Sequence, residues 1–175
     1  MPDPSLSDAI IEAYATAPTD QVIYHTLELW HPIFTAPIRV VRDNAAISAM
    51  IEASAERNPG TMQTFEGYAF DVVPPDQSSA SLPQCVIEID NVSREILAQI
   101  DLAVFEVDPV TVIYRAYLSD NLDGGPENDP PLEMSITQIS ATPLRIRAVA
   151  GFTNLLDKRF PALDYNLEDF PGLVQ

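Results

Sequence analysis

The sequence contains few basic residues. Its 175 residues include 9 Lys and Arg against 26 Asp and Glu, a formal net charge of -17. Sequence-independent binding to nucleic acid needs Lys and Arg on the phosphates, and anionic lipid also attracts basic segments. The composition therefore argues against both partners. The excess of acids indicates either an adaptation to a saline habitat or an acidic surface that repels DNA.

Cysteine and long apolar runs are scarce as well. The single cysteine, Cys85, excludes an internal disulfide, and its place in the apolar run QCVIEID predicts a small core residue. No run approaches the ~18 apolar residues of a membrane-spanning helix. The start MPDPSLSDAI lacks the basic region of a signal peptide. We therefore expect a soluble protein that is made in the cytoplasm.

Motifs of catalysis and cofactor binding are also missing. The sequence has no G-x-S-x-G, P-loop, G-x-G-x-x-G or C-x-x-C. Its two histidines, His25 and His31, do not have metal-ligand spacing; we expect the first to pack beside Leu27 and the second to lie in a loop. We expect no catalytic residue, no cofactor and no metal. A hydrolase built on carboxylate pairs such as Glu88 and Asp90 is the remaining enzymatic hypothesis.

An acidic loop, residues 120–133, surrounds Gly124 and Gly125. Aligning Gly124 with the invariant glycine of an EF-hand places Ser119 first and Pro130 twelfth, which does not give a calcium-binding loop. The prolines predict a stiff, solvated turn. Its acidic residues are Asp120, Asp123, Glu127, Asp129 and Glu133.

Alternating apolar residues predict a β-rich core. Strands are expected within 21–30, 38–43, 61–73, 84–90 and 108–120, and two more within 132–150, separated near Thr142 and Pro143. Helices are expected at 5–15, 44–58 and 93–103, the second from its helix-favouring composition. Strands do not alternate with long helices, so the predicted fold is mainly β, an antiparallel sandwich or split barrel with two or three short helices.

The C-terminal quarter has a different character. We divide the chain into an N-terminal helix and linker (1–19), a β-rich core (20–150) and an extended C-terminal arm (151–175). Large apolar residues recur in the arm without clean periodicity, and two Phe-Pro pairs favour extended backbone. Such an arm either covers its own core or lies on a neighbour, and ~22 residues of it could span up to ~70 Å. Docking on a neighbour is favoured.

Candidate anchors at a subunit contact are the large apolar residues of this arm, with one tryptophan of the core as a further candidate. They are Phe160, Tyr165, Phe170, Leu173 and Trp30. Tryptophan is enriched at such contacts, although simple core packing is the alternative for Trp30.

Three segments together resemble a tailed-phage family known as domain of unknown function 1833. They are VIEIDNVSREI (86–96), PVTVIYRAYLSD (109–120) and the ending with AVAGFTNLLDKRFPALDY and FPGL. Members of this family are encoded among the tail-tip genes of long-tailed phages and prophages, and the family has no assigned catalytic residues.

The resemblance implies a structural virion protein of a non-contractile tail. It would form part of a ring or hub at the tail tip, between the tail tube and the receptor-binding apparatus. The implied partners are further copies, in a three- or six-fold ring, and neighbouring tail proteins. DNA would pass through an acidic lumen without specific binding, and no membrane insertion is implied. The alternative is a β-sandwich adaptor or carbohydrate-binding module, with Tyr24, Trp30 and Tyr117 stacking on sugar rings.

Overall fold

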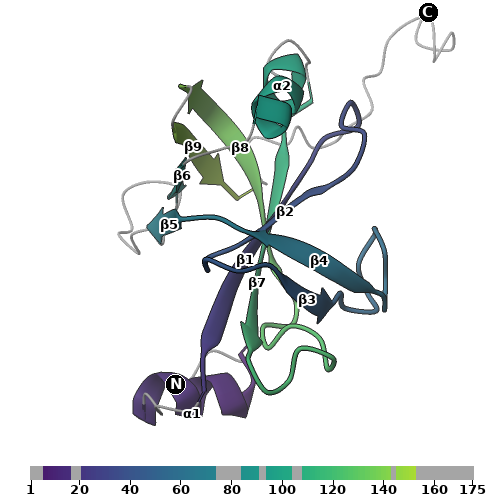
Figure 1. The fold of residues 1–175 in the computed structure, drawn as a ribbon, viewed down its shortest axis with the longest axis vertical. Helices are drawn as coiled ribbons and strands as arrows, with labels where there is room; N and C mark the ends of the chain where they lie inside the picture. The colour runs from purple at the N-terminus through teal and green to yellow at the C-terminus, as the bar shows by residue number, and fades with distance from the viewer. Residues whose placement is uncertain are drawn as a thin grey trace, which may run out of the picture.

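A computed structural model describes residues 6–16, 21–73, 84–90, 94–103, 108–142 and 145–152 (Figure 1). The described chain is mainly β, with nine strands in one mixed sheet and two helices, which confirms the predicted fold class. Most of the predicted arm lies outside the described residues, including its anchors Phe160, Tyr165, Phe170 and Leu173.

The helices and strands follow one another along the chain in the order α1 (Asp8–Thr16), β1 (Ile23–Trp30), β2 (Ile38–Val41), β3 (Ile47–Met50), β4 (Met62–Gly67), β5 (Phe70–Val73), β6 (Gln84–Asp90), α2 (Arg94–Ala103), β7 (Thr111–Leu118), β8 (Leu132–Ala141) and β9 (Arg145–Gly151).

The sheet closes on itself. Its strand order is β3-β4-β2-β1-β7-β8-β9-β6-β5. β4 and β5 are separated only by Tyr68 and Ala69, yet β4 pairs with β2 and β5 pairs with β6 at the far end of the order. Since so short a link cannot cross the whole sheet, the strands curl into a barrel that the continuous β4–β5 segment closes (Figure 1). The structure thus favours a barrel over a sandwich.

The main core fills the barrel and is covered at its two ends by helices. Residues that point inward from β1, β2 and β5 to β9 form this core, among them Leu27 and Leu29 of β1. Cys85 is buried in the same cluster, as the sequence predicts. The helix α2 packs on this core, while α1 lies at the opposite end of the barrel and buries Ile10 against Leu118 (Figure 1).

A second layer covers part of the outer barrel face. The β3–β4 hairpin packs Phe65 and Ile51 against Val41 and Tyr117, which point out of the barrel. This layer explains why the outward face of β1 is also buried, including Glu28. Both faces of β1 are therefore covered.

The predicted helix at 44–58 is wrong. Residues Ile47–Met50 form β3, and a turn follows in which Asn58 and Gly60 have positive φ angles of 53° and 61°. Pairing with β4 and burial of Ala49 outweigh the local helix propensity. The other two predicted helices match α1 and α2, and the predicted break near Thr142 matches the end of β8.

Candidate functional site

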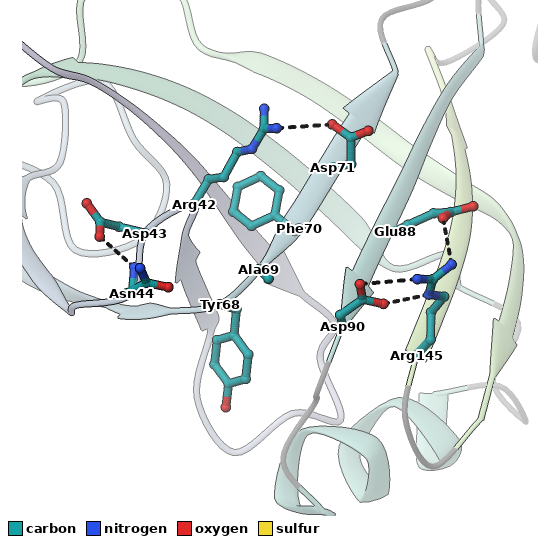
Figure 2. Close-up of a pocket in the computed structure, with 10 residues that line it drawn as sticks. All are labelled: Arg42, Asp43, Asn44, Tyr68, Ala69, Phe70, Asp71, Glu88, Asp90 and Arg145. Atoms are coloured by element: carbon teal, nitrogen blue, oxygen red, sulfur yellow. Dashed lines mark hydrogen bonds and ion pairs between the residues drawn. The ribbon is translucent and has the colours of Figure 1, made fainter.

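An open, polar groove of about 660 Å³ lies on the outer barrel surface beside the β4–β5 junction (Figure 2). We call it the acidic groove, because its carboxylates outnumber its guanidinium groups. Its lining residues come from the end of β2, from β5, from β6 and from the start of β9: Arg42, Asp43, Asn44, Tyr68, Ala69, Phe70, Asp71, Glu88, Asp90 and Arg145.

The groove exists because β4 changes its partner at Gly67. A Cβ atom on Gly67 would lie 2.9 Å from the Asp43 carbonyl oxygen, so only glycine allows this close backbone approach. The Asp43 carboxylate in turn accepts hydrogen bonds from the backbone of Asn44 at 2.5 Å and of Ala45 at 3.3 Å, which fixes the turn after β2. β2 ends there and β5 continues toward β6, which leaves the space between them open.

Arginine side chains join the acids at the groove walls. Arg145 contacts Asp90 through Nε (2.5 Å) and Nη2 (3.2 Å), and its Nη1 lies 3.3 Å from Glu88 (Figure 2). The hydrogen bond with Asp90, with the charges of Asp90 and Glu88, raises the pKa of the Arg145 guanidinium. Across the groove, Arg42 Nη2 lies 3.6 Å from Asp71 Oδ1. Glu88 and Asp90, the carboxylate pair that the sequence offers for a hydrolase, are therefore both bound to the Arg145 guanidinium.

A second hollow of about 230 Å³ lies inside the barrel toward α1, and we call it the barrel-end cavity. Arg42 and Phe70 line both this cavity and the acidic groove, so the two spaces are adjacent. The lining is mostly apolar and consists of Tyr14, His25, Arg42, Phe70, Val72, Cys85, Tyr114, Leu132 and Met134. Its residues come from strands that are distant in the sequence, and no sequence pattern marked them as a group.

Two polar groups of this cavity, the His25 imidazole and the Tyr114 phenol, are held neutral. His25 Nδ1 and the Tyr114 hydroxyl share a 2.7 Å hydrogen bond. Burial, with the nearby Arg42 charge, lowers the pKa of His25. Burial, with the neighbouring Tyr14 phenol, raises the pKa of Tyr114. At neutral pH the cavity therefore offers apolar walls and an uncharged hydrogen-bonded pair, with the Arg42 guanidinium on the side shared with the acidic groove. His25 is half-buried on the inner face, as the sequence predicts for a packed or rim histidine.

A buried ionic network connects the β3–β4 layer to the barrel. Glu28 Oε2 accepts hydrogen bonds from Arg39 Nε at 2.9 Å and Arg115 Nη1 at 3.2 Å. Arg115 also donates two hydrogen bonds to Glu52, at 2.7 and 2.8 Å. The guanidinium of Arg57 lies 5.0 Å from the Trp30 ring centre. Sequence reasoning missed this network, since its members look like ordinary surface charges until the covering layer is known.

The other residues that the sequence analysis considers, Trp30, Tyr117 and His31, lie in packed or hydrogen-bonded positions. Trp30 is half-buried at the end of β1 and packs against the main core. Tyr117 is fully buried and donates a hydrogen bond to the Met50 carbonyl, which leaves no face free for a sugar ring. His31 follows β1, where it is buried and its Nε2 lies 3.1 Å from the Asp108 carbonyl oxygen.

The acidic loop is attached to the barrel rather than fully solvated. Glu127 is buried and accepts hydrogen bonds from the Ser7 hydroxyl and, at 2.8 Å, from the Asn121 amide. Asn128 is buried beside it. Among the described residues, no three His, Cys, Asp or Glu side chains gather as a possible metal site. No helix in the described ranges is long and apolar enough to span a membrane.

Together these features define a small acidic β-barrel whose surface groove adjoins an apolar cavity. The family model described as "Domain of unknown function (DUF1833)" matches residues 9–165, and the chain belongs to this family. The match confirms membership of the family that the three sequence segments indicate, domain of unknown function 1833. It extends beyond the described barrel and includes Phe160 and Tyr165 of the arm. A comparison with curated proteins gives no match.

Proposed function

We propose that this protein is a structural virion protein of a non-contractile phage tail. It acts by binding and geometry as part of the tail-tip ring or hub, at the virion tail tip, after synthesis in the host cytoplasm. One observation carries the proposal: each arginine whose side chain the structure describes is already bound to a carboxylate of the same chain. These are Arg39, Arg42, Arg57, Arg115, Arg145 and Arg147.

This pairing leaves an acidic exterior. Exposed acids are found on α1, on β4, on α2, before β7 and in the acidic loop: Asp8, Glu12, Glu66, Asp101, Asp108, Asp120, Asp123, Asp129 and Glu133. A protein that binds DNA through its backbone must place Lys or Arg side chains on the phosphates, and these side chains must not be paired with the protein's own carboxylates. A surface with its arginines neutralised and its acids exposed repels phosphate instead, which suits a ring through which DNA passes.

Family membership and the chain's ending support an assembly role. The family match runs to residue 165, so the first half of the arm belongs to the family's common domain. A ring of identical subunits forms when one surface of a copy binds a different surface of the next and the rotation closes. The anchors Phe160 and Tyr165 are our candidates for one side of that contact, with Trp30, Phe170 and Leu173 as further candidates.

Immunogold electron microscopy of purified virions tests the proposal. An antibody raised against this chain should label the distal tip of the tail. Absence of label from the tip, in virions where the same antibody detects the chain on a blot, would reject it. A phage in which residues 154–175 are deleted should make the chain but no complete tails. If those tails assemble normally, the arm has no assembly role.

A further inference from the structure

We propose that the barrel-end cavity receives the Phe160 ring of a second copy of this chain, with Lys158 of that copy in the adjoining acidic groove. The inference rests on the proposed ring assembly and names the contact between its subunits.

The cavity suits one aromatic ring. Its volume of about 230 Å³ exceeds the roughly 150 Å³ that accommodates benzene in an engineered protein cavity. Two apolar lining residues are exposed, Tyr14 by 54% and Leu132 by 36%, so the apolar lining reaches the molecular surface. Burial of a phenyl group there removes apolar area from water on both partners.

The groove adds a charge requirement. Phe70 and Arg42 line both spaces, and Figure 2 shows Phe70 beside Arg42 and Asp71. A segment whose aromatic side chain enters the cavity at Phe70 therefore places its neighbouring residues over the carboxylates of the groove. The occupant should carry a cation close to an aromatic residue.

The sequence Lys158-Arg159-Phe160-Pro161 meets this requirement. Lys158 is the chain's only lysine, and it forms with Arg159 the only pair of consecutive basic residues. A residue before proline favours extended backbone, and in an extended segment residues two apart lie on the same side, about 7 Å apart. Lys158 can thus reach the groove when Phe160 is in the cavity.

The other Phe-Pro pair provides an internal contrast. Phe170 follows Glu168 and Asp169, so the same placement would bring carboxylates onto an acidic groove. Coulomb repulsion disfavours it. The two pairs differ mainly in the charge of the residues before them, which makes Phe170 the matched comparison for binding in this cavity.

The position of the arm's start permits a head-to-tail contact. Gly151, at the end of β9, pairs with Ser135 next to the cavity residue Met134, and Ala150 pairs with the cavity residue Cys85. The arm of each copy therefore begins at the barrel end that holds its own cavity. In a ring, that arm can reach the cavity of the next copy, while its own cavity receives the arm of the previous one.

Sedimentation velocity of the full-length chain tests the contact. Wild type should self-associate, and Phe160→Ala should weaken the association by about tenfold to a hundredfold, more than Phe170→Ala does. Circular dichroism checks that each variant is folded. A wild type that stays monomeric, or a folded Phe160→Ala variant that associates as wild type does, would overturn the inference.

Charge reversal tests the groove. Lys158→Glu should weaken association, and so should Asp71→Lys, whose side chain is 66% exposed and so can change without disturbing the core. The double variant should recover part of the lost association. If the double variant is no better than Lys158→Glu alone, Lys158 does not bind in this groove.

Mixing experiments distinguish a second copy from the chain's own arm. Phe160→Ala retains an intact cavity, and Leu132→Asp places a charge at the apolar cavity but keeps an intact arm. At a concentration at which wild type associates and Phe160→Ala does not, each variant alone should stay monomeric, and an equimolar mixture should form a heterodimer. A mixture that remains monomeric would contradict binding between copies.

The two proposals can fail separately. Virions labelled at the tail tip, combined with association that does not depend on Phe160, would reject this contact and retain the proposed function. Association that depends on Phe160, without label at the tip, would reject the proposed function and retain the contact.

Discussion

Glu28 and Arg115 form an ion pair in which both side chains are only 1% exposed, with 3.2 Å between Oε2 and Nη1. The pair joins β1 to β7, and its further partners extend it to β2 through Arg39 and to the turn after β3 through Glu52. A single buried carboxylate therefore links the barrel wall to the layer that covers it.

Removal of the Glu28 carboxylate should be strongly destabilising. Glu28→Ala leaves Arg39 and Arg115 without a shared acceptor in a buried position, and loss of one partner of a buried pair costs about 3–5 kcal/mol. Urea denaturation followed by circular dichroism measures the change in the free energy of unfolding. The exposed Glu133→Ala, in the same region, should change it by less than about 0.5 kcal/mol. A similar small effect for Glu28→Ala would show that the network is not a stabilising link.

The cavity histidine should make stability depend on pH. The pKa of His25 is lowered from 6.5 in the folded protein, so below that pH the unfolded chain binds more protons than the folded chain. Stability should therefore fall as the pH drops through the interval between the two pKa values. His25→Gln removes this contribution.

The urea midpoint is measured at pH 7.5 and at pH 5.5 for wild type and for His25→Gln. The difference between their losses of stability isolates the contribution of His25, because the carboxylates and His31 are common to both proteins. Wild type should lose more stability between the two pH values. Equal losses would mean that His25 titrates normally in the folded protein.

Local sequence patterns located most of the strands. The predicted segment 84–90 is β6 to the residue, and the predicted break near Thr142 separates β8 from β9. These elements are predicted by the alternation of apolar and polar residues and by turn-forming residues, which are signals that span only a few sequence positions. The inward position of Leu27 and Cys85 was predictable for the same reason.

The closure of the barrel and both candidate spaces could not be predicted in this way. β3 has helix-favouring composition and becomes a strand only because Phe65 and Tyr117 shelter its apolar residues. The cavity brings Tyr14, His25 and Tyr114 together from three separate elements. The periodicity of the sequence does not predict contacts between distant elements, because these contacts depend on which strands become neighbours in the sheet.

The β4–β5 junction should not tolerate a side chain at Gly67. A Cβ atom there would lie 2.9 Å from the Asp43 carbonyl oxygen and 3.0 Å from the Ala45 backbone, neither of which is a flexible side-chain end. We expect Gly67→Ala to lower the free energy of unfolding by about 1–3 kcal/mol. Thr64→Ala, an exposed change in the same strand, is the control and should stay within about 0.5 kcal/mol. Thermal unfolding of both variants measures the difference.

The Asn128 side chain should stabilise the half of β7 that does not pair with β8. β8 pairs with β7 only at residues 111–114, and beyond them the Asn128 side chain accepts a hydrogen bond from Ala116 N at 2.9 Å and donates one to Tyr114 O at 3.1 Å. Asn128→Ala leaves these buried backbone groups without partners, at a cost of about 1–3 kcal/mol for each unsatisfied group. Hydrogen exchange should therefore speed up at the Ala116 amide. Asp123→Ala, in the exposed part of the same loop, should leave it unchanged; equal exchange rates in the two variants would show that the loop does not hold β7.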